Sequence, residues 1–281
     1  MVTDHKQDPL VGTYIEERYR IESLLGKGGS AAVYKAFDEK VGRMVAIKLP
    51  KNAGAFAEES KESFEKEATR YIRLQHPNTL RLFDYGQTDS GQTYIVTELL
   101  EGETLTERLD RLKEQGRKGI GAKQTLMLLK DVASALSEAH AVGLVHRDLK
   151  PSNIFLQTLG GQEVIKVIDF GIAKDLQEAT MTGSSSLWGT PLYMSPEQAE
   201  KSALEVDARS DVYSLGVVLY ELLAGRTPFE SDELFSAGLS GVQKIIREKD
   251  PPRPSLRYDS LHDSSQEISA EVAKSRSMDP K

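Results

Sequence analysis

The sequence predicts an α+β protein in which a small antiparallel β-sheet with one helix precedes a larger, mainly helical part. Three observations carry this prediction. Strand-like runs separated by glycines and polar turns fill the N-terminal third of the chain, as in consecutive β-hairpins. One amphipathic helical pattern interrupts these runs. Beyond residues 101–102 the hydrophobic spacing becomes helical, and 281 residues allow about two domains or one large two-lobed unit.

The small part follows residues 1–18, which are polar and have no periodic pattern, so we expect them to form a flexible lead-in. Its predicted strands are residues 19–21, 32–37, 44–49, 80–85 and 93–99. A helix is predicted for residues 58–75, where side chains recur at helical spacing, and His-Pro-Asn at residues 76–78 ends it. The residues that recur at helical spacing are Phe64, Ala68, Tyr71, Ile72 and Gln75, and the predicted inward face carries Phe64, Tyr71 and Leu74.

The larger part is predicted from two helical patterns, at residues 123–142 and 211–224, with a loop and short strands between them at residues 144–168. Residues 179–196 contain many hydroxyl groups and no charged side chain, which is typical of an irregular segment. Residues 250–281 hold four of the 11 prolines and few hydrophobic residues, so we expect them to be weakly structured.

The composition excludes several classes of protein. The chain has no cysteine, which rules out disulfides, thiolate zinc sites and a cysteine nucleophile. Its net charge of −7 argues against broad nucleic-acid binding. The first ten residues contain no apolar signal sequence, and the most apolar stretch, residues 212–224, is too short to span a membrane. We therefore expect a cytoplasmic protein with no nucleic-acid partner and no membrane segment in this chain.

The first of four short motifs is GKGGSAAV at residues 26–33, between two predicted strands. Glycines let a backbone approach phosphate oxygens closely and direct N–H groups at them. A glycine-rich hairpin is, however, more often only a turn. It is also not a nucleoside-triphosphatase P-loop, because no Gly-Lys-Ser/Thr sequence opens a helix here.

The second motif, VAIK at residues 45–48, places Lys48 in an otherwise apolar strand. Lys48 could face water at a sheet edge, or it could contact nucleotide phosphates and be held there by a carboxylate. Glu67 could supply that carboxylate, because it shares the inner face of the predicted helix, whereas Glu65 points elsewhere. An inward glutamate needs a partner, because burying an unpaired carboxylate is costly.

The third motif is HRDLKPSN at residues 146–153, and the fourth is DFG at residues 169–171, directly after a predicted strand. They contribute two carboxylates and an amide on adjacent loops. Such oxygen ligands hold the Mg²⁺ ions that bridge the phosphates of a nucleotide. A further carboxylate can orient an attacking hydroxyl group and accept its proton.

With the four motifs in this order, the chain resembles the eukaryotic-like protein kinases, and specifically their bacterial serine/threonine branch. The resemblance extends from about residue 19 to residue 229. It implies the two-lobed kinase fold, with an N-lobe at residues 19–98, a hinge at 98–102, a C-lobe at 103–281 and one nucleotide cleft. It also implies ATP and Mg²⁺ as cofactors, with Mn²⁺ as a substitute ion.

The resemblance assigns roles to individual positions of this sequence. The positions that would contact ATP are Leu25, Gly26, Lys27, Gly28, Gly29, Val33, Ala46, Lys48, Thr97, Glu98, Leu100 and Phe155. Ala31 stands where the family has a third loop glycine, and the backbone at residues 98–100 would bond the adenine edge. The positions that would serve catalysis are Asp148, Lys150, Lys48, Glu67, Asn153, Asp169 and Thr190.

Among the catalytic positions, Asp148 matches the catalytic base, and Asn153 and Asp169 match the metal ligands. Lys48 and Glu67 match the ion pair at the α- and β-phosphates. Lys150 is the form found in serine/threonine kinases, in which its charge neutralises the γ-phosphoryl group during transfer. The segment at residues 189–197 resembles their substrate-docking segment, in which Thr190 would reach back toward Asp148. The expected substrates are therefore Ser and Thr hydroxyls of proteins.

Regulation by autophosphorylation follows from the same resemblance. In the family, the arginine at the position of Arg147 pairs with a phosphorylated activation loop, and here Thr180 and Thr182 are the candidate acceptors, with residues 184–186, all serines, as further candidates. The alternative is that these hydroxyl groups only make a loop soluble. Two copies of the chain could pair for the transfer.

The C-terminal end departs from the family pattern. The family arginine that pairs with the glutamate at the position of Glu197 follows an Asp/Asn-Pro pair, and the chain stops at Asp-Pro-Lys at residues 279–281. We therefore expect an incomplete C-lobe, with Arg276 as a substitute partner for Glu197. Two alternative functions remain: an inactive kinase-fold scaffold, and a small-molecule phosphotransferase, against which Lys150 and the segment at 190–197 argue.

Overall fold

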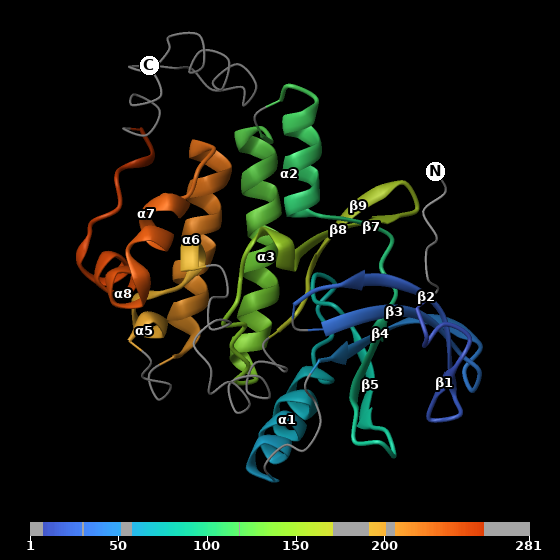
Figure 1. The fold of residues 1–281 in the computed structure, drawn as a ribbon. Coiled ribbons are helices and arrows are strands. Elements are labelled where there is room, and N and C mark those ends of the chain that lie inside the picture. The colour runs from blue at the N-terminus through green and yellow to red at the C-terminus, as the bar shows by residue number, and fades with distance from the viewer. Residues whose placement is uncertain are drawn as a thin grey trace, which may run out of the picture. The chain divides into compact units, whose positions relative to one another are not determined.

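The computed structural model describes residues 8–29, 31–51, 58–117, 119–170, 191–200 and 206–255. These residues form two compact units, each with its own sheet (Figure 1). Of the described residues, the first unit holds those up to 75 together with 80–101, and the second holds 76–79 together with those from 102 to 170 and from 191 onward. No helix in the described ranges combines the length and apolar character needed to cross a bilayer.

The first unit is built on a six-stranded antiparallel sheet with the order β1-β2-β3-β4-β6-β5. The strands are β1 (Tyr14–Ile15), β2 (Tyr19–Lys27), β3 (Ala31–Asp38), β4 (Arg43–Pro50), β5 (Leu82–Gln87) and β6 (Thr93–Glu98). Alternate side chains of β3 and β4 are buried, including Ala36, Val45 and Ile47, so one face of the sheet carries the core. All five predicted strands are present, and the first extends to Lys27.

The expectation of a flexible lead-in is wrong for residues 8–18. Strand β1 pairs with β2, and Ile15 is buried in the core of the sheet, against which Leu10 and Val11 also pack. Scattered apolar residues without a period gave no signal in the sequence, because their partners are distant strands. Residues 1–7 lie outside the described residues.

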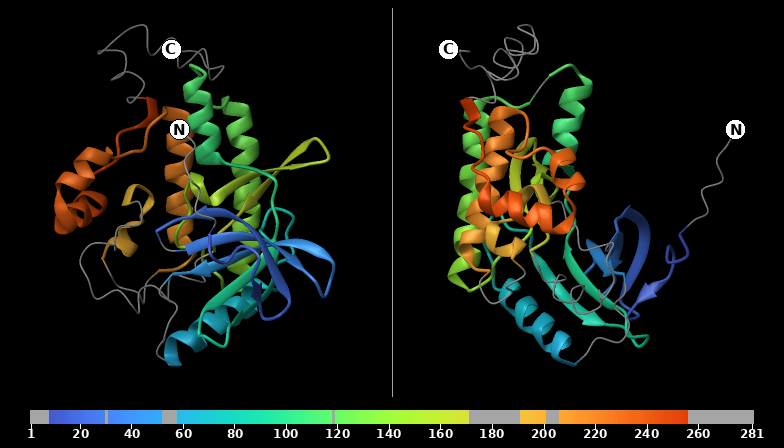
Figure 2. Two further views of the ribbon diagram at one scale, coloured as in Figure 1. Left: turned by 45° about the vertical axis from the view of Figure 1, so that its right-hand side comes forward. Right: turned by 60° about the vertical axis from the view of Figure 1, so that its left-hand side comes forward.

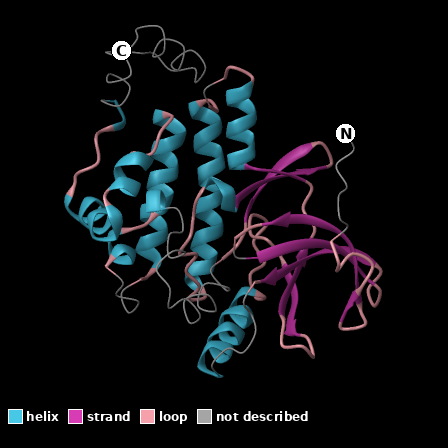
Figure 3. Ribbon diagram, viewed as in Figure 1, coloured by secondary structure: helices cyan, strands magenta, loops and turns pink. Residues whose placement is uncertain are grey.

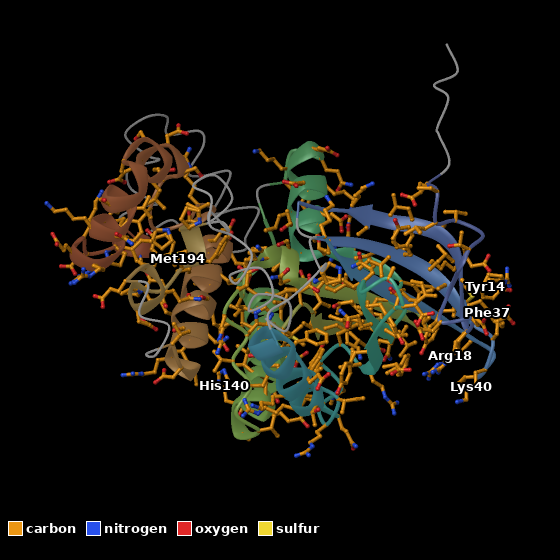
Figure 4. All side chains as sticks on the ribbon, turned by 60° about the horizontal axis from the view of Figure 1, so that its bottom comes forward. Tyr14, Arg18, Phe37, Lys40, His140 and Met194 are labelled. Carbon is orange, nitrogen blue, oxygen red and sulfur yellow. The ribbon has the colours of Figure 1, made fainter. Side chains whose placement is uncertain are left out.

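A cluster of charges and rings ties the end of this lead-in to the sheet (Figure 4). Arg18 donates two hydrogen bonds, of 2.9 and 2.8 Å, to the carboxylate of Asp38 and one of 2.8 Å to Asp84, and its guanidinium lies over the Tyr19 ring. The hydrogen bond from Arg18 lowers the pKa of Asp38, whose side chain is almost fully buried. Bidentate pairs of this kind fix geometry as well as charge.

Helix α1 (Glu58–Tyr71) belongs to the first unit and ends four residues before the predicted end. Phe64 and Tyr71 are buried as predicted, and the Phe64 ring packs edge-to-face on Tyr85 of β5, with centroids 5.7 Å apart. Leu74, the third residue of the predicted inward face, is buried as well. Ile72 and Gln75 are exposed and lie beyond the end of the helix, which was predicted to include them.

The second unit is mainly helical (Figure 3). Its helices are α2 (Leu105–Glu114), α3 (Ala122–Ala141), α5 (Pro196–Ala199), α6 (Ala208–Ala224), α7 (Ser231–Ser236) and α8 (Gly238–Glu248). Helices α3 and α6, which match the two predicted helical patterns, lie side by side (Figure 2). A small sheet joins β7 (Gly102–Thr104), β8 (Ile154–Leu159) and β9 (Gln162–Val167), and the 3₁₀ turns η1 (Pro151–Asn153) and η2 (Pro191–Tyr193) complete the unit.

The last described helices form a separate apolar cluster. Phe229, Leu234, Val242 and Ile246 are buried together with Ala199 of α5. This packing anchors the short helix α5 to α7 and α8. Of the region predicted to be weakly structured, residues 256–281 lie outside the described residues, so that prediction stays open.

Candidate active site

Neither the backbone conformation nor the packing of the glycine-rich loop requires glycine at its three glycine positions. Gly26, Gly28 and Gly29 do not have positive φ angles, so any residue could adopt their conformation. A Cβ atom at Gly26 or Gly29 would meet nothing within 4 Å, and one at Gly28 would meet only Ala31 O at 3.7 Å. The missing side chains leave bare backbone facing open space, which fits a loop that phosphate groups approach closely.

The loop is nevertheless held in shape at its base. Gly26 pairs with Val33 and Lys27 with Ala32 across the β2–β3 ladder. The Gly28 amide donates to Ala31 O at 2.9 Å, and Lys51 donates a hydrogen bond from Nζ to Gly28 O. Of the predicted ATP positions here, Leu25, Gly26, Lys27, Gly28 and Gly29 are all exposed.

Four further predicted ATP positions share one face of the sheet. Lys48 pairs with Val33 of β3, and Ala46 pairs with Thr97 of β6, so the register places all four side chains on the side opposite Val45 and Ile47. Val33, Ala46 and Lys48 are partly accessible, whereas the opposite face is closed by the core. This is the strand geometry that a ligand face requires.

Glu67 is buried on α1, with 9% of its surface exposed, and Glu65 is exposed. This agrees with the predicted helix face. A buried carboxylate must be compensated by a cation or by hydrogen bonds. The ion pair between Glu67 and Lys48 stays a prediction.

The predicted hinge follows β6. Glu98 exchanges hydrogen bonds with the backbone of Arg81, through its own amide at 3.0 Å and its carboxylate at 2.8 Å. Leu99 and Leu100 leave the sheet and are partly buried. Their backbone groups are therefore not used in a strand ladder.

The main stretch of the second unit begins at Gly102, where the backbone and its neighbours require glycine. Its φ is +148°, and a Cβ atom there would lie 2.1 Å from Leu156 O and 3.1 Å from the ring of Phe155. Next to it, Glu103 accepts hydrogen bonds from Arg111 and Arg108, and the bond from Arg111 makes the largest contribution to lowering the pKa of Glu103 to about 2. Phe155, one of the predicted ATP contacts, therefore lies in β8, where it pairs with Thr104 of β7.

The predicted catalytic loop is anchored by a fully buried histidine. His146 Nε2 lies 2.9 Å from Ile168 O, and the Asp148 amide donates to His146 Nδ1 at 3.2 Å. A carbonyl can only accept and an amide N–H can only donate, so the ring is the neutral Nε2–H tautomer. Burial lowers the pKa of His146 in agreement with this. The ring also packs on Phe170, with centroids 4.8 Å apart, which joins both motif loops.

Asp211, which the sequence analysis did not single out, holds the same loop from α6. Its carboxylate accepts the amides of His146 and Arg147, each at 2.8 Å, and lies 2.7 Å from Nε2 of His140 on α3. Arg147 has a φ of +62°, which is unfavourable for a residue with a Cβ atom. Asp211 stabilises this conformation. Asp211 lies in the first turn of α6, where acidic residues are common, so its position in the sequence did not mark it as a residue that holds this loop.

One carboxylate oxygen of Asp148, Oδ2, is contacted by the side chains of both Lys150 and Asn153. Lys150 Nζ lies 3.0 Å from Asp148 Oδ2, and Asn153 Nδ2 donates to the same oxygen at 3.2 Å and to Asp148 O at 2.7 Å. These contacts fix the direction of the Asp148 carboxylate. They also turn the amide nitrogen of Asn153 toward Asp148, so its carbonyl oxygen Oδ1 is the atom suited to a cation.

Asp169 is exposed and has a φ of +59°. The Ile168 amide donates to Asn153 O at 2.9 Å, which brings the Asp169 loop to the Asn153 turn. No group of three potential acidic, histidine or cysteine metal ligands occurs within the described ranges. Mg²⁺ binds through one or two protein oxygens and completes its shell with phosphate oxygens and water, so Asn153 and Asp169 fit a nucleotide-bound ion.

Thr190 lies outside the described residues, but the segment after it is described. Tyr193 donates to Glu221 at 2.6 Å, and burial raises the pKa of Tyr193. Glu197 accepts a hydrogen bond from Ser210. Although burial alone would raise it, this bond lowers the pKa of Glu197. Ser210 is thus a hydrogen-bond donor to Glu197 within residues 191–200 and 206–255, and Arg276, the predicted substitute partner, lies outside the described residues.

A family model described as the protein kinase domain matches residues 19–278, nearly the whole chain. The chain belongs to the protein kinase domain family. The structure of this chain is also similar to the crystal structure of the Mycobacterium tuberculosis PknI kinase domain, with a TM-score of 0.66. The two share 26% sequence identity over 93% of this chain and 89% of that one. The predicted kinase fold is confirmed.

Curated relatives of the kinase domain are bacterial. It is 39% identical to serine/threonine-protein kinase PknA of Mycobacterium tuberculosis over 88% of this chain and 55% of the relative. It is 36% identical to serine/threonine-protein kinase pkn3 of Myxococcus xanthus over 90% and 45%, and 39% identical to a probable serine/threonine-protein kinase of Clostridium acetobutylicum over 83% and 34%. The chain thus spans between about a third and about half of the length of these relatives.

Proposed function

We propose that this kinase domain transfers the γ-phosphoryl group of ATP to Ser and Thr hydroxyl groups of proteins. One observation carries the proposal: Asp148 is partly accessible on a loop that His146 and Asp211 anchor, with Lys150 and Asn153 at one of its oxygens. This arrangement suits a base that orients a hydroxyl group beside a cation that neutralises a phosphoryl group. The curated relatives carry the same activity in their names.

The proposed reaction is an in-line displacement. The substrate hydroxyl oxygen forms a bond to the γ-phosphorus while the bond to the β-phosphate oxygen breaks, and Asp148 accepts the hydroxyl proton. Lys150 stabilises the transferred group and Lys48 the α- and β-phosphates, with Glu67 orienting Lys48. Mg²⁺, or Mn²⁺ in its place, would offset the phosphate charge when held by Asn153 and Asp169. Positioning and electrostatics then supply most of the rate enhancement.

We assign the N-lobe to residues 19–98, the hinge to 98–102 and the C-lobe to 103–281, and we propose that the reaction uses cytoplasmic ATP. The adenine would bind Val33, Ala46, Thr97, Leu100 and Phe155. The face shared by Val33, Ala46 and Thr97 supports this assignment.

We also propose autophosphorylation on Thr180 or Thr182, with a second copy of the chain as one possible acceptor. A phosphate would add about −1.5 to −2 charges, which Arg147 could pair with. Mass spectrometry after incubation with MgATP tests this. Phosphate confined to other segments would refute it.

The decisive experiment measures transfer of radiolabel from ATP to the chain itself and to a generic basic protein. Asp148→Asn and Lys48→Met should each lower the rate by about 10²–10⁴-fold. Asp110→Asn and Lys130→Met are matched controls, because both side chains are exposed, on α2 and α3, and should keep wild-type rates. Equal signals from all five proteins would refute the proposed function, as would transfer that EDTA does not abolish.

A further inference from the structure

Gln198 in helix α5 contacts two parts of the second unit at once. Its Oε1 atom accepts hydrogen bonds from the amide and hydroxyl of Ser195, at 3.1 and 3.2 Å. Its Nε2 atom donates to Arg147 O at 2.7 Å, across 51 residues of sequence. The side chain therefore joins the segment at residues 191–200 to the residue that directly precedes Asp148.

The contact with Ser195 does not require glutamine. Ser195 is the N-cap of α5, and Gln198 completes a capping box, in which glutamate serves as well as glutamine. The contact with Arg147 is different, because a carbonyl oxygen needs a donor and a carboxylate has none. Of glutamine and glutamate, only glutamine can both accept from Ser195 and donate to Arg147. Replacing Gln198 by glutamate therefore separates a capping role from a role at the catalytic loop.

The carbonyl that Gln198 binds belongs to the peptide group between Arg147 and Asp148. The N–H of that planar group donates to His146 Nδ1 at 3.2 Å. Both polar atoms of the peptide are thus held, one by His146 and one by Gln198. The orientation of this plane sets the direction in which the Asp148 side chain leaves the backbone.

Arg147 itself has an unfavourable conformation, with a φ of +62°. Its amide is held by Asp211 at 2.8 Å and its carbonyl by Gln198 at 2.7 Å. Conformations of this kind persist where the surroundings hold them in place. Asp211 comes from the long helix α6, whereas Gln198 comes from the four-residue helix α5. The carbonyl contact therefore depends on the placement of residues 191–200.

We propose that Gln198 is a positioning residue that couples the placement of residues 191–200 to the orientation of Asp148. The inference rests on the proposed kinase activity. Gln198 does not touch the reacting atoms; it acts through the Arg147 carbonyl. Losing that contact lets the peptide rotate, and a displacement of about 1 Å at a catalytic group costs about 100-fold in rate. ATP binding does not involve this peptide, so the Michaelis constant for ATP should change little.

The test compares three variants of the full chain. Gln198→Glu keeps the capping box and removes only the donor to Arg147. Gln198→Met removes both contacts at similar side-chain size. Gln243→Met is the matched control. Gln243 lies in α8 and donates a hydrogen bond of 2.7 Å to the carbonyl of Ala199 in α5, the helix that carries Gln198, but it does not reach the catalytic loop. Turnover number, Michaelis constant for ATP and midpoint of urea unfolding are measured for each.

We expect Gln198→Glu to lose about 10–100-fold in kcat, with a Michaelis constant for ATP within threefold of wild type and an unfolding midpoint lowered no more than in Gln243→Met, which likewise loses one hydrogen bond to a backbone carbonyl. Gln198→Met should lose at least as much kcat and also unfold at lower urea, and Gln243→Met should unfold earlier yet keep kcat within threefold. Wild-type turnover in Gln198→Glu would overturn the inference, as would equal losses in Gln243→Met. Absence of transfer by the wild-type chain and by Gln243→Met alike would remove the proposed function, and the inference with it.

Discussion

Replacing Asp211 by asparagine tests how the catalytic loop is held. The carboxylate is 1% exposed, and its two oxygens accept the amides of His146 and Arg147 and contact His140. Asparagine offers one acceptor oxygen and one donor group. If its oxygen faces Arg147, its NH₂ group faces the His146 amide; if it is flipped, the NH₂ group faces the Arg147 amide. In either orientation one buried N–H loses its acceptor.

The cost can be worked from these contacts. An orphaned buried amide costs about 1–3 kcal/mol, and a retained hydrogen bond loses about 1 kcal/mol when its acceptor is no longer charged. The lower cost of burying a neutral amide offsets part of this. We expect the free energy of unfolding of Asp211→Asn to fall by about 2–4 kcal/mol, a large fraction of the typical 5–15 kcal/mol.

Urea unfolding followed by circular dichroism measures this change. Asp207→Asn is the control, because Asp207 is the exposed N-cap of the same helix and asparagine caps equally well, so the change should stay below about 0.5 kcal/mol. A destabilisation of Asp211→Asn within about 1 kcal/mol of the control would show that the loop does not depend on this carboxylate.

Three further predictions concern other parts of the chain. Gly102→Ala should destabilise by about 2–5 kcal/mol in urea unfolding, because its Cβ atom would meet Leu156 O at 2.1 Å. The buried, neutral His146 should make the protein less stable as the pH is lowered. Because burial lowers the pKa of His146 in the folded chain, only the unfolded chain binds this proton just below about pH 6.5. The free energy of unfolding should therefore decrease by up to about 1.4 kcal/mol for each pH unit below that value. Removing residues 1–13 should cost about 2–3 kcal/mol of stability, because Leu10 and Val11 pack on the core of the sheet.

Each of these has its own check. Gly116→Ala is the control for Gly102→Ala, because its φ is +73° but nothing lies within 4 Å of the added atom, so about 1–2 kcal/mol is expected. Equal losses in both variants would contradict the steric argument. An NMR titration in which the folded His146 ring protonates near its ordinary pKa would contradict the second prediction, and an unchanged unfolding curve after removal of residues 1–13 would contradict the third.

Local patterns predicted the fold where the physical cause is local. The strands β3 and β4 differ from their predicted bounds by one residue at each end, because alternating burial is a property of neighbouring residues. Helix α3 was likewise placed within one residue. The lead-in failed because Ile15 and Leu10 are buried by distant strands rather than by a periodic face of their own segment.

The candidate site shows the same division. Asp148, Asn153 and Asp169 could be predicted as site residues because they stand in contiguous motifs with fixed spacing. Asp211 and Gln198 were missed because each bonds a backbone atom of a loop more than fifty residues away. Every residue carries the same backbone groups, so the sequence does not show which of them will accept or donate such a bond.

The sequence by itself determined the family, the two-part fold and the candidate residues for phosphoryl transfer, since these depend on side-chain identity and short-range spacing. The tertiary structure alone decided what holds that chemistry in place: the bonds from Asp211 and Gln198 to the backbone of Arg147, the burial of His146, and Ser210 as the donor to Glu197. Burial and hydrogen-bond partners arise only when segments distant in sequence pack together.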